Sequence, residues 1–134
     1  MPLHFYNSLH RRVEAFTPIT PGQVALYTCG PTVYDFAHVG NFRAYMFEDL
    51  LRRSLTYAGY AVTQVMNLTD VDDKTIKGSQ RAGLPLADFT RKYKDAFFED
   101  LEALRIQPAE HYPAATEHIQ EMIDLIRALM DKGI

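Results

Sequence analysis

The feature that most constrains the fold is a strand, helix and strand pattern within residues 24–68. Residues 24–29 form an apolar run of strand-forming residues, residues 42–58 place apolar side chains at helical spacing, and residues 60–68 form a second apolar, β-branched run. Short connections between such elements indicate a right-handed parallel βαβ unit. The sequence therefore predicts an α/β fold with a Rossmann-like parallel sheet and flanking helices.

A loop with reactive side chains joins the first apolar run to the helix. It spans residues 29–41 and reads CGPTVYDFAHVGN. Gly40 lets a ligand approach the backbone at the helix start, where free N–H groups and the helix dipole can hold an anion. Cys29 and His38 are the reactive side chains, although a lone cysteine that ends a strand is more often a small buried apolar residue. The loop therefore predicts a phosphate-binding site.

Three carboxylates follow the second apolar run, at Asp70, Asp72 and Asp73. They lie at the same predicted sheet edge as Cys29, where open α/β sheets bind ligands. The cluster could hold Mg²⁺, but we favour the alternative in which one carboxylate caps the next helix and another pairs with Lys or Arg.

The remaining segments predict peripheral structure and further helices. Residues 1–21 are expected to form a hairpin or extended arm with a solvated pair of arginines at positions 11 and 12, and residues 107–115 a proline-bearing loop. Thr116 is predicted to cap a last helix that Gly133 ends. Two apolar stripes support two helices with core-facing sides: they comprise Phe89, Tyr93, Phe97, Leu101 and Leu104 in one, and Ile119, Met122, Ile123, Ile126 and Met130 in the other.

Four charged residues interrupt the apolar positions of the central helix. Glu48, Asp49, Arg52 and Arg53 are predicted to face water, where some could form ion pairs along the helix.

Composition narrows the class of protein. A chain of 134 residues with 47% hydrophobic content can form one compact domain with a real core. A formal net charge of -3 argues against binding nucleic acid by bulk electrostatics, so any such contact must be local. The single cysteine cannot form an internal disulfide, and no leader pattern opens the chain, so we expect a cytoplasmic protein. No apolar run approaches the roughly 20 residues of a membrane helix.

Two motifs resemble one family of enzymes. The string His38-Val39-Gly40-Asn41 resembles the first signature of the class I aminoacyl-tRNA synthetases, His-hydrophobic-Gly-His. The more specific pattern Cys-Gly-x-Thr-x-Tyr-Asp precedes it at residues 29–35, and NLTDVDDK at residues 67–74 resembles the second strand-end signature of the cysteinyl-tRNA synthetases. The chain is therefore identified as similar to that family over nearly its whole length.

The resemblance implies a domain boundary. Residues 1–134 would be the N-terminal portion of a Rossmann-like catalytic domain, the first half of a class I synthetase catalytic domain. The later catalytic half and the anticodon-binding region would be absent, together with three of the four zinc ligands and the mobile Lys-Met-Ser-Lys-Ser loop. We expect such a fragment to be inactive alone and to self-associate through its exposed sheet edge.

The implied reaction is the ATP-dependent activation of cysteine to cysteinyl-adenylate and its transfer to tRNA-Cys. The implied substrates are L-cysteine, ATP with Mg²⁺, and tRNA-Cys. The catalytic residues would be His38, which donates to phosphate oxygens, and Asn41, which replaces the second histidine of the motif. The residues that would bind ATP or the adenylate are Cys29, Gly30, Pro31, Thr32, His38, Gly40, Asn41, Ala44, Asn67, Leu68 and Thr69.

The resemblance also makes Cys29 one ligand of a Zn²⁺ ion. Zinc prefers sulfur ligands and could accept the thiolate of the cysteine substrate, which the hydroxyl of serine cannot match.

Two alternatives to this function stay open at the level of sequence. One is a related ATP-dependent ligase that joins cysteine to an amino-sugar inositol in mycothiol synthesis. The other is a non-catalytic nucleotide-binding domain derived from a synthetase.

Overall fold

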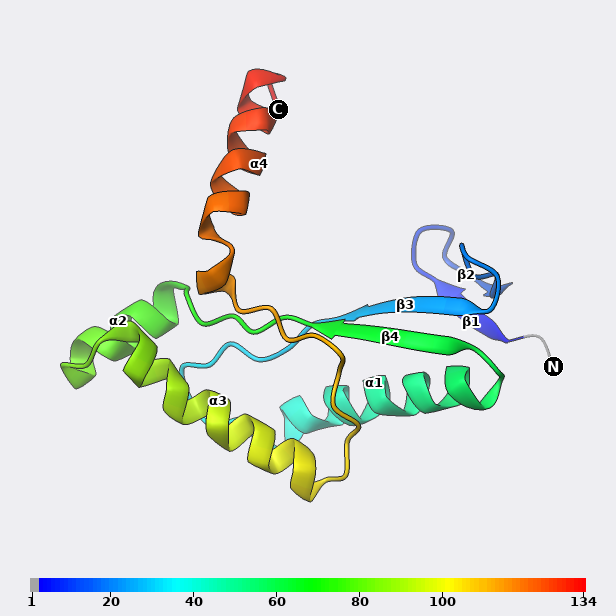
Figure 1. Cartoon of the computed structure of the whole chain (residues 1–134), viewed down its shortest axis with the longest axis horizontal. Helices are drawn as coiled ribbons and strands as arrows, with labels where there is room; N and C mark the ends of the chain where they lie inside the picture. The colour runs from blue at the N-terminus through cyan, green and yellow to red at the C-terminus, as the bar shows by residue number, and fades with distance from the viewer. Residues whose placement is uncertain (1–2) are drawn as a thin grey trace.

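A computed structural model describes residues 3–134, and its centre is a parallel βαβ unit (Figure 1). Strand β3 (Gln23–Thr28) pairs in parallel with β4 (Ala61–Met66), from Gln23 opposite Ala61 to Thr28 opposite Met66. Helix α1 (Val39–Tyr57) connects the two strands. The predicted α/β fold with a parallel sheet is confirmed, although the sheet is small.

Helix α1 begins earlier than its apolar periodicity predicts. The pattern suggested a start near Phe42, whereas the first helical residue is Val39 and His38 is the N-cap. The predicted start was wrong because polar capping, which carries no apolar period, extends the helix into the loop.

The far edge of β4 is covered by a segment that the sequence predicted to be a loop. Met66 N donates to His111 O at 3.0 Å, and Leu68 N donates to Pro113 O at 2.9 Å. Isolated parallel bridges join Val65 to His111 and Leu68 to Ala114. The segment thus acts as an irregular third strand, and it satisfies backbone groups that would otherwise be left at the edge of the sheet.

The core lies between the sheet and the two helices on one side of it, α1 and α3 (Leu86–Ala103) (Figure 1). The buried cluster combines Phe42 and Tyr45 of α1 with Phe97 and Leu101 of α3 beneath Met66 and neighbouring residues. The predicted aromatic stripe is therefore core at Phe89, Phe97 and Leu101. It was wrong at Leu104, which is 44% exposed just after α3 ends.

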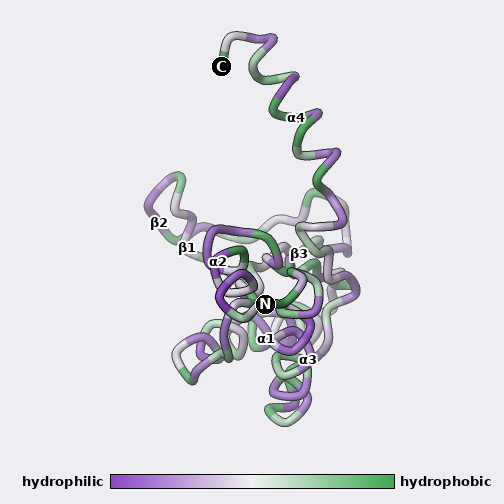
Figure 2. The backbone as a smooth tube through the Cα atoms, turned by 90° about the vertical axis from the view of Figure 1, so that its left-hand side faces the viewer, coloured by the Kyte–Doolittle hydropathy of each residue, from purple (hydrophilic) through white to green (hydrophobic). Residues whose placement is uncertain are grey.

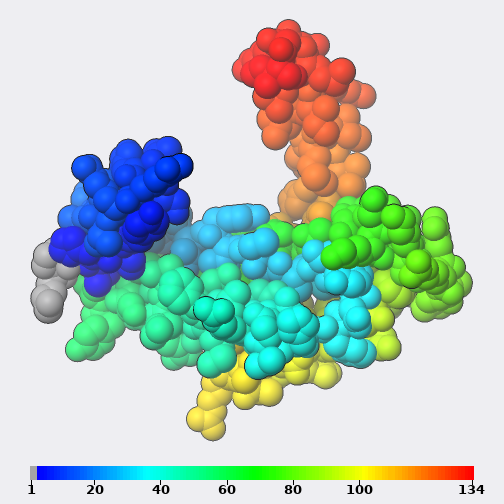
Figure 3. Space-filling model, turned by 180° about the vertical axis from the view of Figure 1, so that it is seen from behind, coloured from blue at the N-terminus to red at the C-terminus, as the bar shows by residue number. Residues whose placement is uncertain are grey.

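Helix α4 (Ile119–Asp131) extends away from the rest of the molecule (Figures 1 and 3). The structure describes this helix in full, and none of its residues is buried. Apolar and polar residues alternate along its tube in Figure 2. The predicted helix is confirmed, but its stripe has no partner among the described residues, and Thr116 does not cap it. Thr116 lies in the short 3-10 helix η1 (Ala115–Glu117) and bonds to Asp70 instead.

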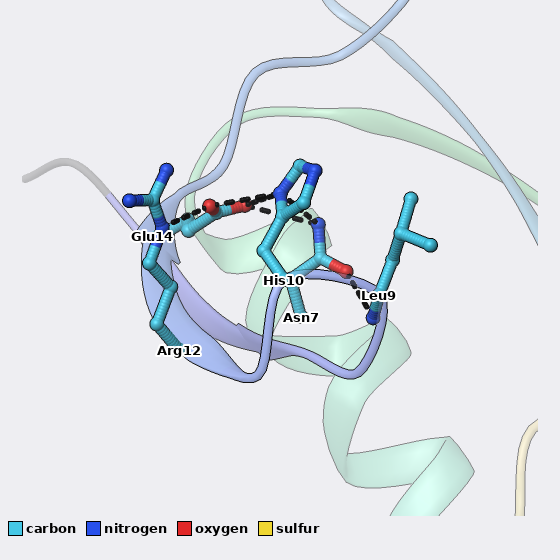
Figure 4. A network of polar contacts seen from close by, with 5 residues as sticks. All are labelled: Asn7, Leu9, His10, Arg12 and Glu14. Atoms are coloured by element: carbon cyan, nitrogen blue, oxygen red, sulfur yellow. Dashed lines mark hydrogen bonds and ion pairs between the residues drawn. The ribbon is translucent and has the colours of Figure 1, made fainter.

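An antiparallel hairpin precedes the parallel unit. The sequence predicted a hairpin or extended arm over residues 1–21, of which positions 1 and 2 lie outside the described residues. Its strands are β1 (His4–Asn7) and β2 (Arg12–Ala15). Glu14 accepts hydrogen bonds from Arg12 Nε at 2.6 Å and Asn7 Nδ2 at 2.9 Å, beside His10 (Figure 4). These bonds, first from Arg12, then from His10 and Asn7, hold the pKa of Glu14 below its ordinary value. Phe16 then docks the hairpin edge-to-face on Tyr60, with ring centroids 5.7 Å apart.

Candidate functional site

The two signature segments lie side by side where β3 and β4 end. Thr69 N donates to Pro31 O at 3.0 Å and Val33 N donates to Thr69 O at 3.1 Å, and a parallel bridge joins Thr32 to Thr69. The chain thus continues its parallel pairing for several residues beyond the strands. As a result, residues predicted from motifs 37 positions apart form one surface at the carboxyl edge of the sheet.

Asn67 ties these two segments together through its side chain. Its Oδ1 accepts from Tyr27 Oη at 3.0 Å and from Gly30 N at 3.4 Å, and its Nδ2 donates to Thr69 Oγ1 at 3.2 Å. The two backbones approach so closely that a Cβ on Gly30 would lie 1.9 Å from Asn67 O. Only glycine fits at position 30 without moving one of the segments.

His38 and Asn41 form a reciprocal capping box at the start of α1. His38 Nδ1 accepts from Gly40 N at 3.0 Å, and His38 N donates to Asn41 Oδ1 at 3.0 Å. Because Nδ1 is an acceptor, the neutral ring carries its proton on Nε2. The sequence suggested that the N–H groups at the helix start are free for an anion, but the N–H of Gly40 already donates to His38. The donor that the exposed His38 offers is instead Nε2–H.

A cavity of about 350 Å³ opens between the loop and the start of α2 (Asp73–Ala82). It brings together five of the predicted site residues: Gly30, Pro31, Thr32, His38 and Asn41. It also adds residues that were not predicted as site residues: Tyr34, Asp35, Phe36, Ala37, Tyr45 and Lys74. Tyr34 and Asp35 are the last two residues of the Cys-Gly-x-Thr-x-Tyr-Asp motif at residues 29–35. Their place in that motif is the signal that could have identified them as site residues.

The other predicted site residues lie around or away from this cavity. Cys29 directly follows β3 and has an exposed thiol, which donates to Gly30 O at 3.8 Å. Gly40 and Ala44 line a different hollow, on the outer side of α1. Leu68 is only 4% exposed and its side chain belongs to the core.

The acidic cluster after β4 divides its roles as the sequence predicted. Asp72 caps α2 by accepting from Lys74 N at 2.9 Å and Thr75 N at 2.8 Å. Asp70 is 2% exposed and accepts from Lys94 Nζ at 2.6 Å. Desolvation raises the pKa of Asp70, but the bonds from Lys94 and Thr116 outweigh it, so that the pKa lies below its ordinary value.

The sequence predicted that Glu48 faces water, but its side chain is half-buried. Its Oε2 is buried and has no hydrogen-bond partner among the described residues. Burial raises the pKa of Glu48, and the side chain of Thr28 only partly offsets this. Neighbouring Tyr45 has its pKa raised to about 12 by burial first and then by the charges of Glu48 and Cys29. A polar cluster thus lies beneath the end of β3.

The described residues do not by themselves fit a zinc site. No group of three or more His, Cys, Asp or Glu side chains within residues 3–134 is placed to hold a metal ion. Cys29 is a single thiol, whereas a tetrahedral zinc site takes three or four protein ligands. In the same part of the chain, no helix has the length and apolarity needed to cross a bilayer.

Comparisons with known proteins agree on one family. The family described as "tRNA synthetases class I (C) catalytic domain" matches residues 15–134. Proteins named cysteine–tRNA ligase are similar over nearly all of the chain. That of Protochlamydia amoebophila is 56% identical over 134 residues, covering 100% of this chain and 28% of the relative. That of Brachyspira hyodysenteriae is 59% identical over 129 residues, covering 96% of this chain and 27% of the relative. The chain therefore spans just over a quarter of the length of these relatives.

Proposed function

The chain belongs to the class I tRNA synthetase family whose catalytic domain it matches, and from that premise we propose that it is the N-terminal, ATP-binding part of a cysteine–tRNA ligase. The proposed reaction is activation of L-cysteine by ATP with Mg²⁺, followed by transfer of the cysteinyl group to tRNA-Cys in the cytoplasm. The remaining part of the catalytic domain and the anticodon-binding region would complete the enzyme. An exposed edge of β3 would let the isolated fragment self-associate.

The observation that carries this proposal is the direct pairing of the two signature segments beside His38. Thr32 and Thr69 are joined by a backbone bridge, and His38 and Thr32 line the same cavity. Parallel sheets bind nucleotides at such an edge. A cavity with hydroxyl, imidazole and amide donors suits a triphosphate and its adenylate product.

In the first step, the substrate carboxylate attacks the α-phosphate and pyrophosphate leaves. This chemistry needs alignment and charge stabilisation more than a protein nucleophile. His38 would donate from Nε2 to phosphate oxygens as their negative charge increases. Its ring orientation is fixed by the bond from Gly40 N, so little reorganisation would accompany the reaction. Asn41 has its Oδ1 occupied by His38 N, which leaves the amide Nδ2 as a second donor.

Cys29 would contribute one thiolate to a Zn²⁺ ion, with the other ligands from outside this chain. The metal, when bound, would favour the thiol substrate over serine. The exposed thiol of Cys29 at the sheet edge is compatible with the role of a zinc ligand. Substituting Cys29→Ser in the full-length protein should therefore lower the zinc content measured by atomic absorption while the circular dichroism spectrum is retained. Full zinc occupancy in that variant would remove Cys29 from the ligand set.

Cysteine-dependent ATP–pyrophosphate exchange by the full-length protein tests the function. We expect His38→Ala to lower kcat by about 100-fold or more with little change in KM for ATP, because the bond strengthens mainly in the transition state. His111→Ala is the matched control, because His111 is also exposed but contributes only its backbone to β4. Exchange that does not require cysteine, or no exchange at all, would contradict the proposed function.

The names of the relatives do not favour the amino-sugar ligase of mycothiol synthesis. The non-catalytic alternative would be supported by ATP binding without exchange in the full-length protein.

A further inference from the structure

One side of α4 is a continuous apolar surface. The apolar residues of this stripe recur at helical spacing, and they are Ile119, Met122, Ile123, Ile126, Leu129 and Met130. Each of these side chains is between 37% and 69% exposed, and no residue of α4 is buried. Asp124 and Asp131 lie on the opposite side of the helix, because they are nearly half a turn away from the stripe. An exposed apolar side of this kind marks an interaction surface.

A helix as short as α4 needs packing to be stable. α4 has 13 residues, and isolated helices of about 12–15 residues or fewer are marginal in water, so that most of their stability comes from packing of an apolar side. The N-cap, His118, makes no side-chain capping hydrogen bond, and the last turn has no basic residue to offset the helix dipole. Packing of the stripe is therefore the main stabilisation still open to α4.

The junction before α4 fixes the direction of the helix. Thr116 in η1 is bound to Asp70 through its backbone N at 2.9 Å and its Oγ1 at 2.7 Å. His118 follows η1 directly and is already the N-cap of α4; its N donates to Ala115 O at 3.2 Å, and its O accepts from Met122 N at 3.1 Å. α4 therefore projects on the side of the sheet opposite α1 and α3 (Figure 1). Folding α4 back onto its own sheet would break this junction, whereas a second molecule can reach the stripe without any such change.

We propose that α4 is a self-association surface, along which the α4 of a second copy of this chain packs in antiparallel orientation. The stripe is nearly symmetric about its middle, so that reversal places Ile123 opposite Ile126 and joins two identical surfaces by a two-fold axis. Antiparallel packing also opposes the two helix dipoles, and it brings Lys132 of one copy near the exposed Glu117 of the other. Asp124 and Asp131 stay in water on the outer side.

The apolar area of the stripe suits a weak, reversible dimer. Six half-exposed side chains offer roughly 100 Å² each, so two paired stripes would bury about 1,200 Å². This area is at the lower end of the range for specific interfaces, and we expect a Kd on the order of 10 μM. The surface is separate from the edge of β3, and association through it requires no ligase activity, so its failure would leave the proposed function untouched.

Sedimentation equilibrium of the 134-residue chain measures this association. Between about 1 and 200 μM, the mean mass should rise from the 15.3 kDa of one chain toward twice that value. The helical circular dichroism signal should rise over the same range, since pairing stabilises α4. A chain that stays monomeric throughout would overturn the proposal, whether its stripe remains exposed or folds back onto the same molecule.

Two lysine variants on the same helix test which side of α4 is used. Ile126→Lys should raise Kd by about 100-fold or more, because pairing would bury an ammonium group of each copy in an apolar interface. Lysine is a better helix former than isoleucine, so the loss would not come from helix propensity. Ala128→Lys is the matched control, because position 128 is exposed on the side opposite the stripe, and it should dimerise as the wild type does. Dimers that persist in Ile126→Lys, as expected for pairing through the edge of β3, or equal losses in both variants would refute the proposal.

The orientation of the two helices is tested by a distance between spin labels. A nitroxide on Lys132→Cys, in a Cys29→Ser background that removes the native thiol, would be separated from its counterpart by about 15 helical residues, or roughly 22 Å along the helix axis, in the antiparallel pair. Double electron–electron resonance should report a separation of about 20–30 Å between the two labels. A separation below about 15 Å would indicate a parallel pair and would overturn the antiparallel arrangement.

Discussion

Removal of the Asp70 carboxylate tests how the second signature is held in place. Asp70 lies just after the bridge between the signatures and accepts three hydrogen bonds, from Lys94 Nζ at 2.6 Å, Thr116 Oγ1 at 2.7 Å and Thr116 N at 2.9 Å. In Asp70→Ala, the Lys94 side chain, which is 24% exposed, loses its counter-ion. The variant should therefore disconnect α3 and η1 from the end of β4.

The expected magnitude follows from these contacts. Breaking a buried ion pair by removing one partner costs about 3–5 kcal/mol. Because Lys94 and Thr116 can both recover some contact with water, we expect a smaller loss of about 2–4 kcal/mol in the free energy of unfolding. For a domain of this size, this corresponds to a fall in Tm on the order of 10 °C.

The loss should depend on pH in a definite direction. The folded-state pKa of Asp70 is lowered, so its contribution is fully present above the unfolded pKa of about 3.9 and disappears as pH falls through the folded value. The difference between wild type and Asp70→Ala should thus be constant near pH 7 and should shrink below about pH 4.

Urea unfolding followed by circular dichroism at pH 7 and pH 3.5 measures both effects. Asp73→Ala is the control, because that carboxylate is 90% exposed and, among residues 3–134, pairs with Lys77 alone, so its removal should change stability by less than about 0.5 kcal/mol. Equal stabilities of Asp70→Ala and the control at pH 7 would refute the argument, as would a difference that grows in acid.

Two further variants test the packing beneath and beside the cavity. Glu48→Gln should raise the unfolding free energy by about 1 kcal/mol at pH 8, since it removes a half-buried carboxylate with a raised pKa, one oxygen of which is buried without a partner among the described residues. That gain should vanish below about pH 4, where the folded and unfolded carboxyl are both protonated, and a pH-independent change in thermal melting would contradict it. Gly30→Ala should destabilise the chain by more than about 2 kcal/mol, because the new Cβ would collide with Asn67 O. Gly59→Ala is the comparison: its Cβ would meet nothing within 4 Å, but its φ of +94° strains any L side chain, so it measures backbone strain without a collision. A loss in Gly30→Ala no larger than that in Gly59→Ala would count against the collision.

The sequence predicted the βαβ unit because apolar periodicity is a local property. It also predicted that one carboxylate of the acidic cluster caps the next helix, because capping is a local signal, and Asp72 does so. It predicted that another pairs with Lys or Arg, but it could not name Asp70 or its partner Lys94, which lies 24 positions away. It did not predict that residues 110–115 would extend the sheet, because Pro113 among them suggests a loop and their partners lie more than 40 positions away. The partial burial of Glu48 was not predicted, because an amphipathic pattern does not show how many sides of a helix are covered.

The candidate site divides in a similar way. Motif strings located Gly30, Thr32 and His38 at one cavity. They could not show that Gly40 N is already occupied by His38, because that depends on the rotamer of the capping ring. Ala44 occupies a motif position but faces a different hollow, since helical geometry turns it away from the loop.

Three contacts that cannot be read from the motifs hold the second signature, residues 67–74, in position. Asn67 binds the loop after β3, Leu68 pairs through its backbone with Pro113 and Ala115, and Asp70 binds Lys94. The contacts come from three different directions, so moving any one of them would displace Thr69 relative to Thr32. The geometry of the proposed adenylate site is therefore a property of residues up to η1, although its recognisable residues end at α2. This is why stability measurements on Asp70 and Gly30 report on the site itself, and not only on the fold.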